Sequence, residues 1–172
     1  MGRKSTNPNK NIYQERREEL GLSREAASEA LGVIAPERIE KIENEKSNPH
    51  PDEILAMSEG YKMPELCNYY CANECAIGQK YVPEVKVRDL SQIILEMLDS
   101  LNAMEEQQKR LIQISANGKI ERDEVKDFVH IQENLERISI NVETLQLWAE
   151  QMIANGAIDM NEYNSYKNRK NK

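Results

Sequence analysis

The chain has 172 residues, 31% of them charged and 5% aromatic, and its formal net charge is −7. This composition favours long helices over a β-sandwich, and the acidic balance gives the whole chain no attraction for a polyanion. No apolar run approaches the roughly 18 residues that span a bilayer, no leader sequence is visible, and three cysteines do not make a secreted disulfide framework. We therefore expect a cytoplasmic protein that has no membrane partner.

Basic residues are concentrated at the two ends of the chain. Residues 1–10 carry three basic residues and no acidic one, and residues 167–172 carry four basic residues. We expect a flexible basic arm over 1–10, of the kind that reaches DNA phosphates or a minor groove. At the other end, a short helix and a basic tail are expected over 159–172.

Residues 11–66 have the pattern of five short helices. The first is expected over 12–20, followed by Gly21 in the left-handed conformation that ends many helices. Ser23 is the expected cap of the second helix. The positions of this second helix that should face inward are Ala26, Ala27, Ala30 and Leu31.

The third helix is expected to begin at Pro36, because proline suits the first turn of a helix. Its inward face carries Ile39 and Ile42, and the sequence Asn48-Pro49-His50-Pro51 ends it. Another helix should start near Asp52. Its expected core positions are Ile54, Leu55, Ser58 and Tyr61.

These features together resemble the lambda-repressor/Cro-like (XRE-type) helix-turn-helix family. The resemblance covers residues 11–66, and it rests on Gly21-Leu22-Ser23, Ala27, Leu31-Gly32-Val33, Ile39, Ile42-Glu43, Lys46 and Asn48-Pro49. It implies a DNA-binding domain in which Arg17 pairs with Glu43 and fixes the first helix to the third. Two features depart from the family: the turn after Gly32 is one residue longer, and Arg16 occupies a position that is commonly apolar or small.

The resemblance also implies which residues face DNA, and it places two acids among the four positions that face the groove. Lysine can donate to guanine and glutamate can accept from cytosine N4, but Glu37 and Glu40 would also meet the phosphate field. Alternatively, these two acids pair with Arg38 and Lys41 on a merely solvated face. The full set of expected DNA contacts is Arg24, Pro36, Glu37, Arg38, Glu40, Lys41, Lys46 and Asn48.

Residues 67–83 form a segment that carries all three cysteines. Cys67, Cys71 and Cys75 are four residues apart, which in a helix places their sulfurs along one face. With His50 as a fourth ligand they could bind zinc, or the three alone could hold an iron–sulfur cluster with an open corner. The alternative is that the thiols pack under neighbouring tyrosines. Because the spacing matches no strong zinc signature, we expect no cofactor.

Residues 84–158 contain two apolar stripes with alternating steps of three and four residues, separated by a break at Asn117-Gly118. The first stripe is Leu90, Ile94, Met97, Leu101, Met104, Gln108 and Leu111. The second is Phe128, Ile131, Leu135, Ile138, Val142, Leu145, Ala149 and Met152. This spacing predicts an antiparallel hairpin of two long helices.

The hairpin carries more apolar residues than one seam between two helices requires. The additional ones are Leu98, Ile112, Ile140, Leu147 and Trp148. Either they pack on the N-terminal domain, or two hairpins associate into a four-helix bundle. We favour the second possibility and therefore expect a homodimer.

The sequence therefore predicts an all-α protein with an N-terminal five-helix lambda-repressor-like domain and a C-terminal antiparallel long-helix hairpin. We find no P-loop, nucleophile elbow or dinucleotide fingerprint, and we expect no enzymatic activity. The predicted function is that of a sequence-specific transcriptional regulator that binds double-stranded DNA as a dimer. Two alternatives remain: an interaction module whose acidic third helix binds a protein partner, or a cysteine-based metal or redox sensor.

Overall fold

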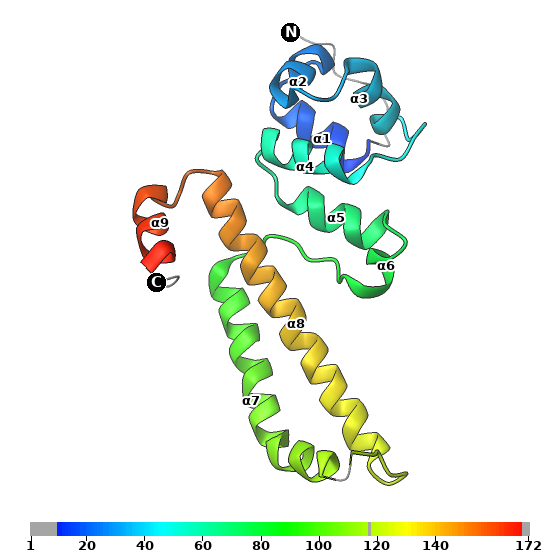
Figure 1. The fold of residues 1–172 in the computed structure, drawn as a ribbon, viewed down its shortest axis with the longest axis vertical. Helices are drawn as coiled ribbons and strands as arrows, with labels where there is room; N and C mark the ends of the chain where they lie inside the picture. The colour runs from blue at the N-terminus through cyan, green and yellow to red at the C-terminus, as the bar shows by residue number, and fades with distance from the viewer. Residues whose placement is uncertain (1–9, 117, 170–172) are drawn as a thin grey trace. The chain divides into compact units, whose positions relative to one another are not determined.

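The computed structural model of the protein describes residues 10–116 and 118–169. Most of the expected basic arm, Asn117 of the predicted break and the last three residues of the tail lie outside the described residues. Within the described part, all regular secondary structure is helical, which confirms the all-α prediction (Figure 1). None of the described helices is long and apolar enough to cross a membrane.

The chain divides into two compact units. One unit comprises residues 1–84 together with 150–172, and the other comprises residues 85–149. The first unit contains α1 (Ile12–Glu19), α2 (Arg24–Leu31), α3 (Pro36–Glu43), α4 (Pro51–Gly60), α5 (Glu65–Asn73), α6 (Gly78–Tyr81) and α9 (Met160–Arg169). The second contains α7 (Leu90–Ser115) and most of α8 (Val125–Ala154).

The predicted helix ends agree with the structure at the positions where the sequence supplies a specific cap. Ser23 accepts a hydrogen bond from the backbone N–H of Ala26 and begins α2, as expected. Gly21 follows α1 with φ of 69°, in the left-handed region, and Pro36 occupies the first turn of α3. The local sequence therefore sets the end of α1 and the starts of α2 and α3.

The core of the first unit is apolar, with contributions from α1 to α5. Its buried members include Tyr13, Ala27, Leu31, Ile34, Ile39, Ile42, Ile54, Met57, Tyr61 and Leu66. Two predicted core positions are wrong: Ala30 is exposed, and 57% of Leu55 is exposed. Each lies one residue from a buried residue, at about 100° around its helix. Met57, three residues after Ile54, occupies the core position that we had expected for Leu55.

The second unit is an antiparallel hairpin of α7 and α8, as predicted (Figure 1). Pairs across the two helices join Asp99 to Arg137 at 2.7 Å and Arg110 to Asp127 at 2.5 Å. Residue numbers therefore rise along one helix as they fall along the other.

The seam of the hairpin differs from the predicted one, because only half of each apolar stripe faces the neighbouring helix. Ile131 is buried at the seam, whereas Ile94, Leu101, Leu135 and Val142 are between 38% and 51% exposed. The contact between the helices is therefore rotated around both helix axes relative to the predicted stripes, so that one edge of each stripe stays exposed. The remaining seam positions are occupied by residues outside the predicted stripes: Ile93, Ser100, Ile114, Asn134, Asn141 and Thr144.

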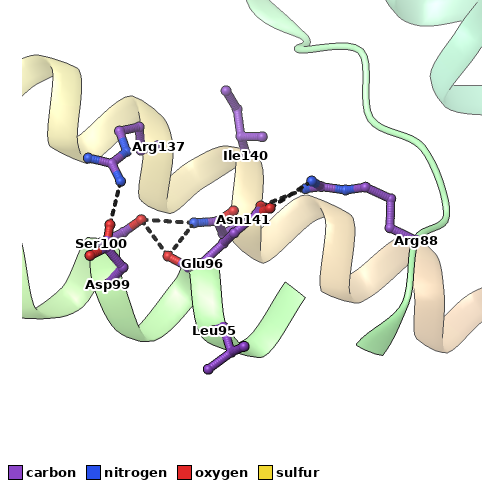
Figure 2. Close-up of a pocket in the computed structure, with 8 residues that line it drawn as sticks. All are labelled: Arg88, Leu95, Glu96, Asp99, Ser100, Arg137, Ile140 and Asn141. Atoms are coloured by element: carbon purple, nitrogen blue, oxygen red, sulfur yellow. Dashed lines mark hydrogen bonds and ion pairs between the residues drawn. The ribbon is translucent and has the colours of Figure 1, made fainter. Parts of the chain in front are cut away.

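Polar side chains line one side of this seam, which we call the polar face (Glu96, Asp99, Ser100, Arg137 and Asn141). The amide of Asn141 donates to the Ser100 hydroxyl at 2.9 Å and to the Glu96 carbonyl at 3.1 Å. Figure 2 shows these bonds beside the Arg137–Asp99 pair, at the edge of an open hollow of about 590 Å³. Hydrogen bonds as well as apolar contacts therefore hold the two helices together.

Candidate nucleic-acid interface

The candidate interface is built on α2, the turn that follows it and α3. Gly32 ends α2 with φ of 72°, and the turn runs from there to Ala35, which precedes Pro36. Ile34 is buried within this turn, whereas 77% of Val33 is exposed. The turn is thus attached to the core through Ile34, and it sets the direction in which α3 leaves α2.

A buried carboxylate fixes the C-terminal end of α3 to both preceding helices. The Glu43 side chain is 1% exposed and accepts from Arg17 of α1 at 2.9 Å and from Arg24 of α2 at 2.8 Å. The Arg17–Glu43 pair that the family resemblance implied is therefore confirmed. Removing one partner of such a buried pair is costly, since it leaves an uncompensated charge away from water.

Two polar residues of α1 and its N-cap strengthen this framework, and neither was identified as an anchor from the sequence. Asn11 caps α1, and its amide also donates to the Ile42 carbonyl of α3 at 2.9 Å. Arg16 donates twice to the carbonyl of Tyr61, the residue that ends α4, at 2.9 and 3.1 Å. The arginine that departs from the family pattern thus satisfies a carbonyl at a helix end.

Arg38, which we expected at the edge of the DNA surface, is engaged inside the domain. Its guanidinium makes two bonds of 2.6 Å to Glu53 of α4, and it also contacts Ser47 and the Asn48 carbonyl. The alternative that paired Arg38 with a neighbouring acid on its own helix is therefore wrong. The hydrogen bond from Arg38 lowers the pKa of Glu53, which also accepts from the backbone N–H of His50.

The outward face of α3 carries the remaining predicted contacts. Glu37 and Lys41 are exposed, whereas Pro36 and Glu40 are half-buried. Glu40 lies 3.4 Å from Lys46, the residue expected at a phosphate, and among the described residues it forms its ion pair there and not with Lys41. Among the described residues of α3, Lys41 is therefore the one cation without a carboxylate partner.

The cations available to phosphates are few in the described domain. Residues 14–65 contain seven basic and thirteen acidic residues. Arg24 uses its Nε for Glu43 but keeps 32% of its side chain exposed, and Lys46 is 63% exposed. Asn48, two residues after Lys46, is exposed, and its backbone carbonyl accepts a hydrogen bond from Arg38. Arg24, Lys41 and Lys46 are thus the accessible cations of this surface.

The cysteines lie on and after α5, and all three are half-buried free thiols. Cys67 and Cys71 belong to the helix, whereas Cys75 follows its C-cap, so the helical face expected for all three sulfurs is interrupted. Cys67 packs against the apolar core together with Tyr69 and Tyr70. The backbone at Gly78, the first residue of α6, lies so close to the Cys71 carbonyl that any side chain at residue 78 would collide with it.

The described residues offer no group of three or more histidine, cysteine or acidic side chains placed to hold a metal ion. His50, the expected fourth ligand, is exposed at the start of α4. Burial raises the pKa of the Cys71 thiol, and neighbouring Cys75 and Cys67 act in the same direction. A redox-sensing thiol normally has the opposite shift, towards the thiolate.

Comparison with known proteins finds a match for one part of the chain. A family model described as helix-turn-helix matches residues 14–65, which run from the third residue of α1 to the first residue of α5. No curated protein and no solved structure matches the chain. The matched residues contain every anchor of α3 described above except Asn11.

Proposed function

Because residues 14–65 form a helix-turn-helix domain of the lambda-repressor/Cro-like family, we propose that the protein is a sequence-specific transcriptional regulator that binds double-stranded DNA. The single observation that carries this proposal is the fixation of α3. Arg17 and Arg24 bind its C-terminal end through Glu43, and Glu53 holds Arg38 near its start. A helix held from both ends presents its outward side chains in one geometry, as base recognition requires.

Base recognition in this proposal belongs to Glu37, Glu40 and Lys41, with Pro36 allowing close approach at the start of α3. Lysine donates to guanine O6 and N7, and a glutamate can accept from cytosine N4 in the major groove. Phosphate contacts belong to Arg24 and Lys46, aided by Asn48 and the basic arm. Arg38 has a positioning role in this scheme, because its guanidinium is occupied by Glu53.

We further propose that two copies act together on a two-fold operator with half-sites about one helical turn, roughly 34 Å, apart. The division into arm (1–10), DNA-binding domain (11–66), cysteine segment (67–83), hairpin (84–158) and tail (159–172) belongs to the same proposal. A regulator of this kind works where the DNA is, in the cytoplasm, and needs neither an enzymatic activity nor a cofactor.

The proposal is tested by selecting binding sites for the full-length protein from a random DNA pool, then measuring affinities by mobility shift. Lys41→Ala should cost about 1–3 kcal/mol at the best site and relax the preference at one base pair. Lys46→Ala should weaken all sequences alike and reduce the salt slope by about 1 per copy. Lys126→Ala, which removes an exposed lysine of α8, is the matched control and should change neither quantity. A selected site that tolerates both domain variants would contradict the assignment.

A second candidate function is an interaction module whose α3 binds a protein. The excess of acidic residues over 14–65 and the engagement of Arg38 favour it, because both reduce the attraction to phosphates. The same selection distinguishes the two candidates. Retention of particular sequences at about 0.1 M salt supports the regulator, and failure to retain any DNA even at low salt supports the module.

A further inference from the structure

The hairpin exposes a row of apolar side chains that its own two helices do not cover. The row, which we call the apolar face, consists of Ile94, Leu98, Leu101, Ile112, Leu135 and Val142, each between 38% and 61% exposed. On α7 and α8 alike, these residues recur mainly at steps of three, four or seven. This is the spacing that lets one helix pack along another.

These residues lie on one side of the hairpin, opposite the polar face. Ser100 and Asn141 are hydrogen-bonded across the two helices. Because the helices are antiparallel and right-handed, the next residue along each turns by about 100° towards the same side. Leu101 follows Ser100 and Val142 follows Asn141, so these two side chains lie on the same side of the hairpin. The other four residues of the apolar face are placed on that side by their helical spacing from Leu101 or Val142. Figure 2 shows the other side, where ion pairs and hydrogen bonds accompany the seam and where Leu95, 68% exposed, is an isolated apolar side chain beside them.

A shallow groove adjoins the apolar face at Leu101. Leu101 lines this groove of about 380 Å³ together with Met104, Glu105, Gln108 and Leu111, all from α7. Met104 and Leu111 are half-buried, whereas Leu101 is exposed. Such a groove accepts the side chain of a neighbouring helix as a knob enters a hole.

The size of this surface matches that of a protein interface. The exposed parts of the six side chains amount to on the order of 500 Å², the size of the largest apolar patch of a single protein, which is often a functional surface. A standard interface buries about 800 Å² on each partner, of which about 65% is apolar at the core. The apolar face therefore supplies the apolar area that one side of a stable dimer needs.

We propose that the apolar face is covered by the apolar face of a second copy, so that two hairpins form a four-helix bundle around a two-fold axis. A second copy offers the same row of side chains at the same spacing, as a two-fold interface requires. Glu105 is the one charged residue that lines the groove, which gives little basis for recognising a charged partner. The proposal rests in part on the proposed function, because a two-fold operator requires two helix-turn-helix domains.

Sedimentation equilibrium of the full chain without DNA tests the proposal. We expect wild-type protein at about 10 µM to have twice the monomer mass of 19.9 kDa. Leu101→Glu should shift it to the monomer, because the new carboxylate would be buried between the copies. Arg137→Glu, on the polar face and 53% exposed, is the control and should remain dimeric. A monomeric wild type, or a Leu101→Glu variant that stays dimeric, would overturn the proposal.

A second readout covers the case in which Leu101→Glu fails to fold. A photo-reactive phenylalanine analogue at residue 98 keeps the apolar face apolar and should cross-link two copies, whereas the same analogue at residue 137 should not. Cross-linking from 137 alone would overturn the proposal. Because these measurements omit DNA, the two proposals can fail separately: a dimer that selects no DNA contradicts only the regulator, and a monomer that selects DNA contradicts only this interface.

Discussion

The helix-turn-helix domain and the hairpin place their apolar and polar side chains in contrasting ways. In the domain, Ile39, Met57 and Tyr61 are fully buried, and buried charges such as Glu43 join one helix to the next. In the hairpin, Ser100 and Thr144 occupy buried positions while several leucines remain exposed. The contrast indicates that the domain has a closed apolar core, whereas the hairpin leaves a row of apolar side chains exposed, which we propose a second copy covers.

The largest effect that we expect comes from the core of the domain. Ile39→Ala should lower the free energy of unfolding of the domain by about 2–5 kcal/mol, because Ile39 is fully buried and the cavity cannot collapse completely. Urea unfolding followed by far-UV circular dichroism measures the loss. The same loss should be found at any protein concentration. A change below about 1 kcal/mol would show that the domain core is not closed.

A smaller, pH-dependent effect is expected from the pair that holds Arg38. Because its folded pKa is lowered, Glu53 stabilises the domain above its unfolded pKa of about 4.3, and this stabilisation is lost as the pH falls through the folded value. Glu53→Gln should therefore lower the free energy of unfolding by about 1–2 kcal/mol at pH 7. The difference in this free energy between the variant and the wild type should shrink as the pH falls towards 3.

The matched control for this measurement is Glu59→Gln, an exposed acid on the same helix, which should change the stability by less than about 0.5 kcal/mol at either pH. Thermal unfolding between pH 3 and 7 gives the comparison. If the gap between wild type and Glu53→Gln is the same at pH 3 and pH 7, the Arg38–Glu53 pair is not its cause.

The smallest expected effect lies on the polar face of the hairpin. Asp99 pairs with Arg137 at 2.7 Å, but the two side chains are 72% and 53% exposed. Exposed pairs of this kind contribute little, so Asp99→Asn should change the stability of the hairpin by less than about 0.5 kcal/mol and leave its mass unchanged. A larger loss, seen in denaturant unfolding, would mean that this pair contributes more to holding α7 and α8 together than an exposed ion pair should.

The parts of the fold that could be predicted are those set by neighbours in the sequence. Ser23, Pro36 and Gly21 act within one turn of their own position, and their roles were predicted from residue type. Arg17 and Glu43 were paired through the family resemblance, because 26 residues separate them.

The parts that could not be predicted depend on the angle at which helices meet. The partner of Arg38 is Glu53, fifteen residues away, and the pattern of α3 alone suggested a nearer acid. In the hairpin, a stripe of 3.5-residue spacing gives the apolar surface without saying which edge faces the neighbouring helix. Leu101 and Val142 were therefore correctly identified as apolar stripe residues but wrongly assigned to the seam.

The contrast between the two regions is tested most directly by the unfolding of the hairpin at two protein concentrations. Trp148, the single tryptophan of the chain, lies on α8, so its fluorescence follows the hairpin. Raising the concentration of full-length protein 100-fold should stabilise a dimer by about 2.7 kcal/mol and move the urea midpoint up by about 1 M. Coincident curves at the two concentrations would contradict the account, because they would show that the hairpin is complete in a single copy.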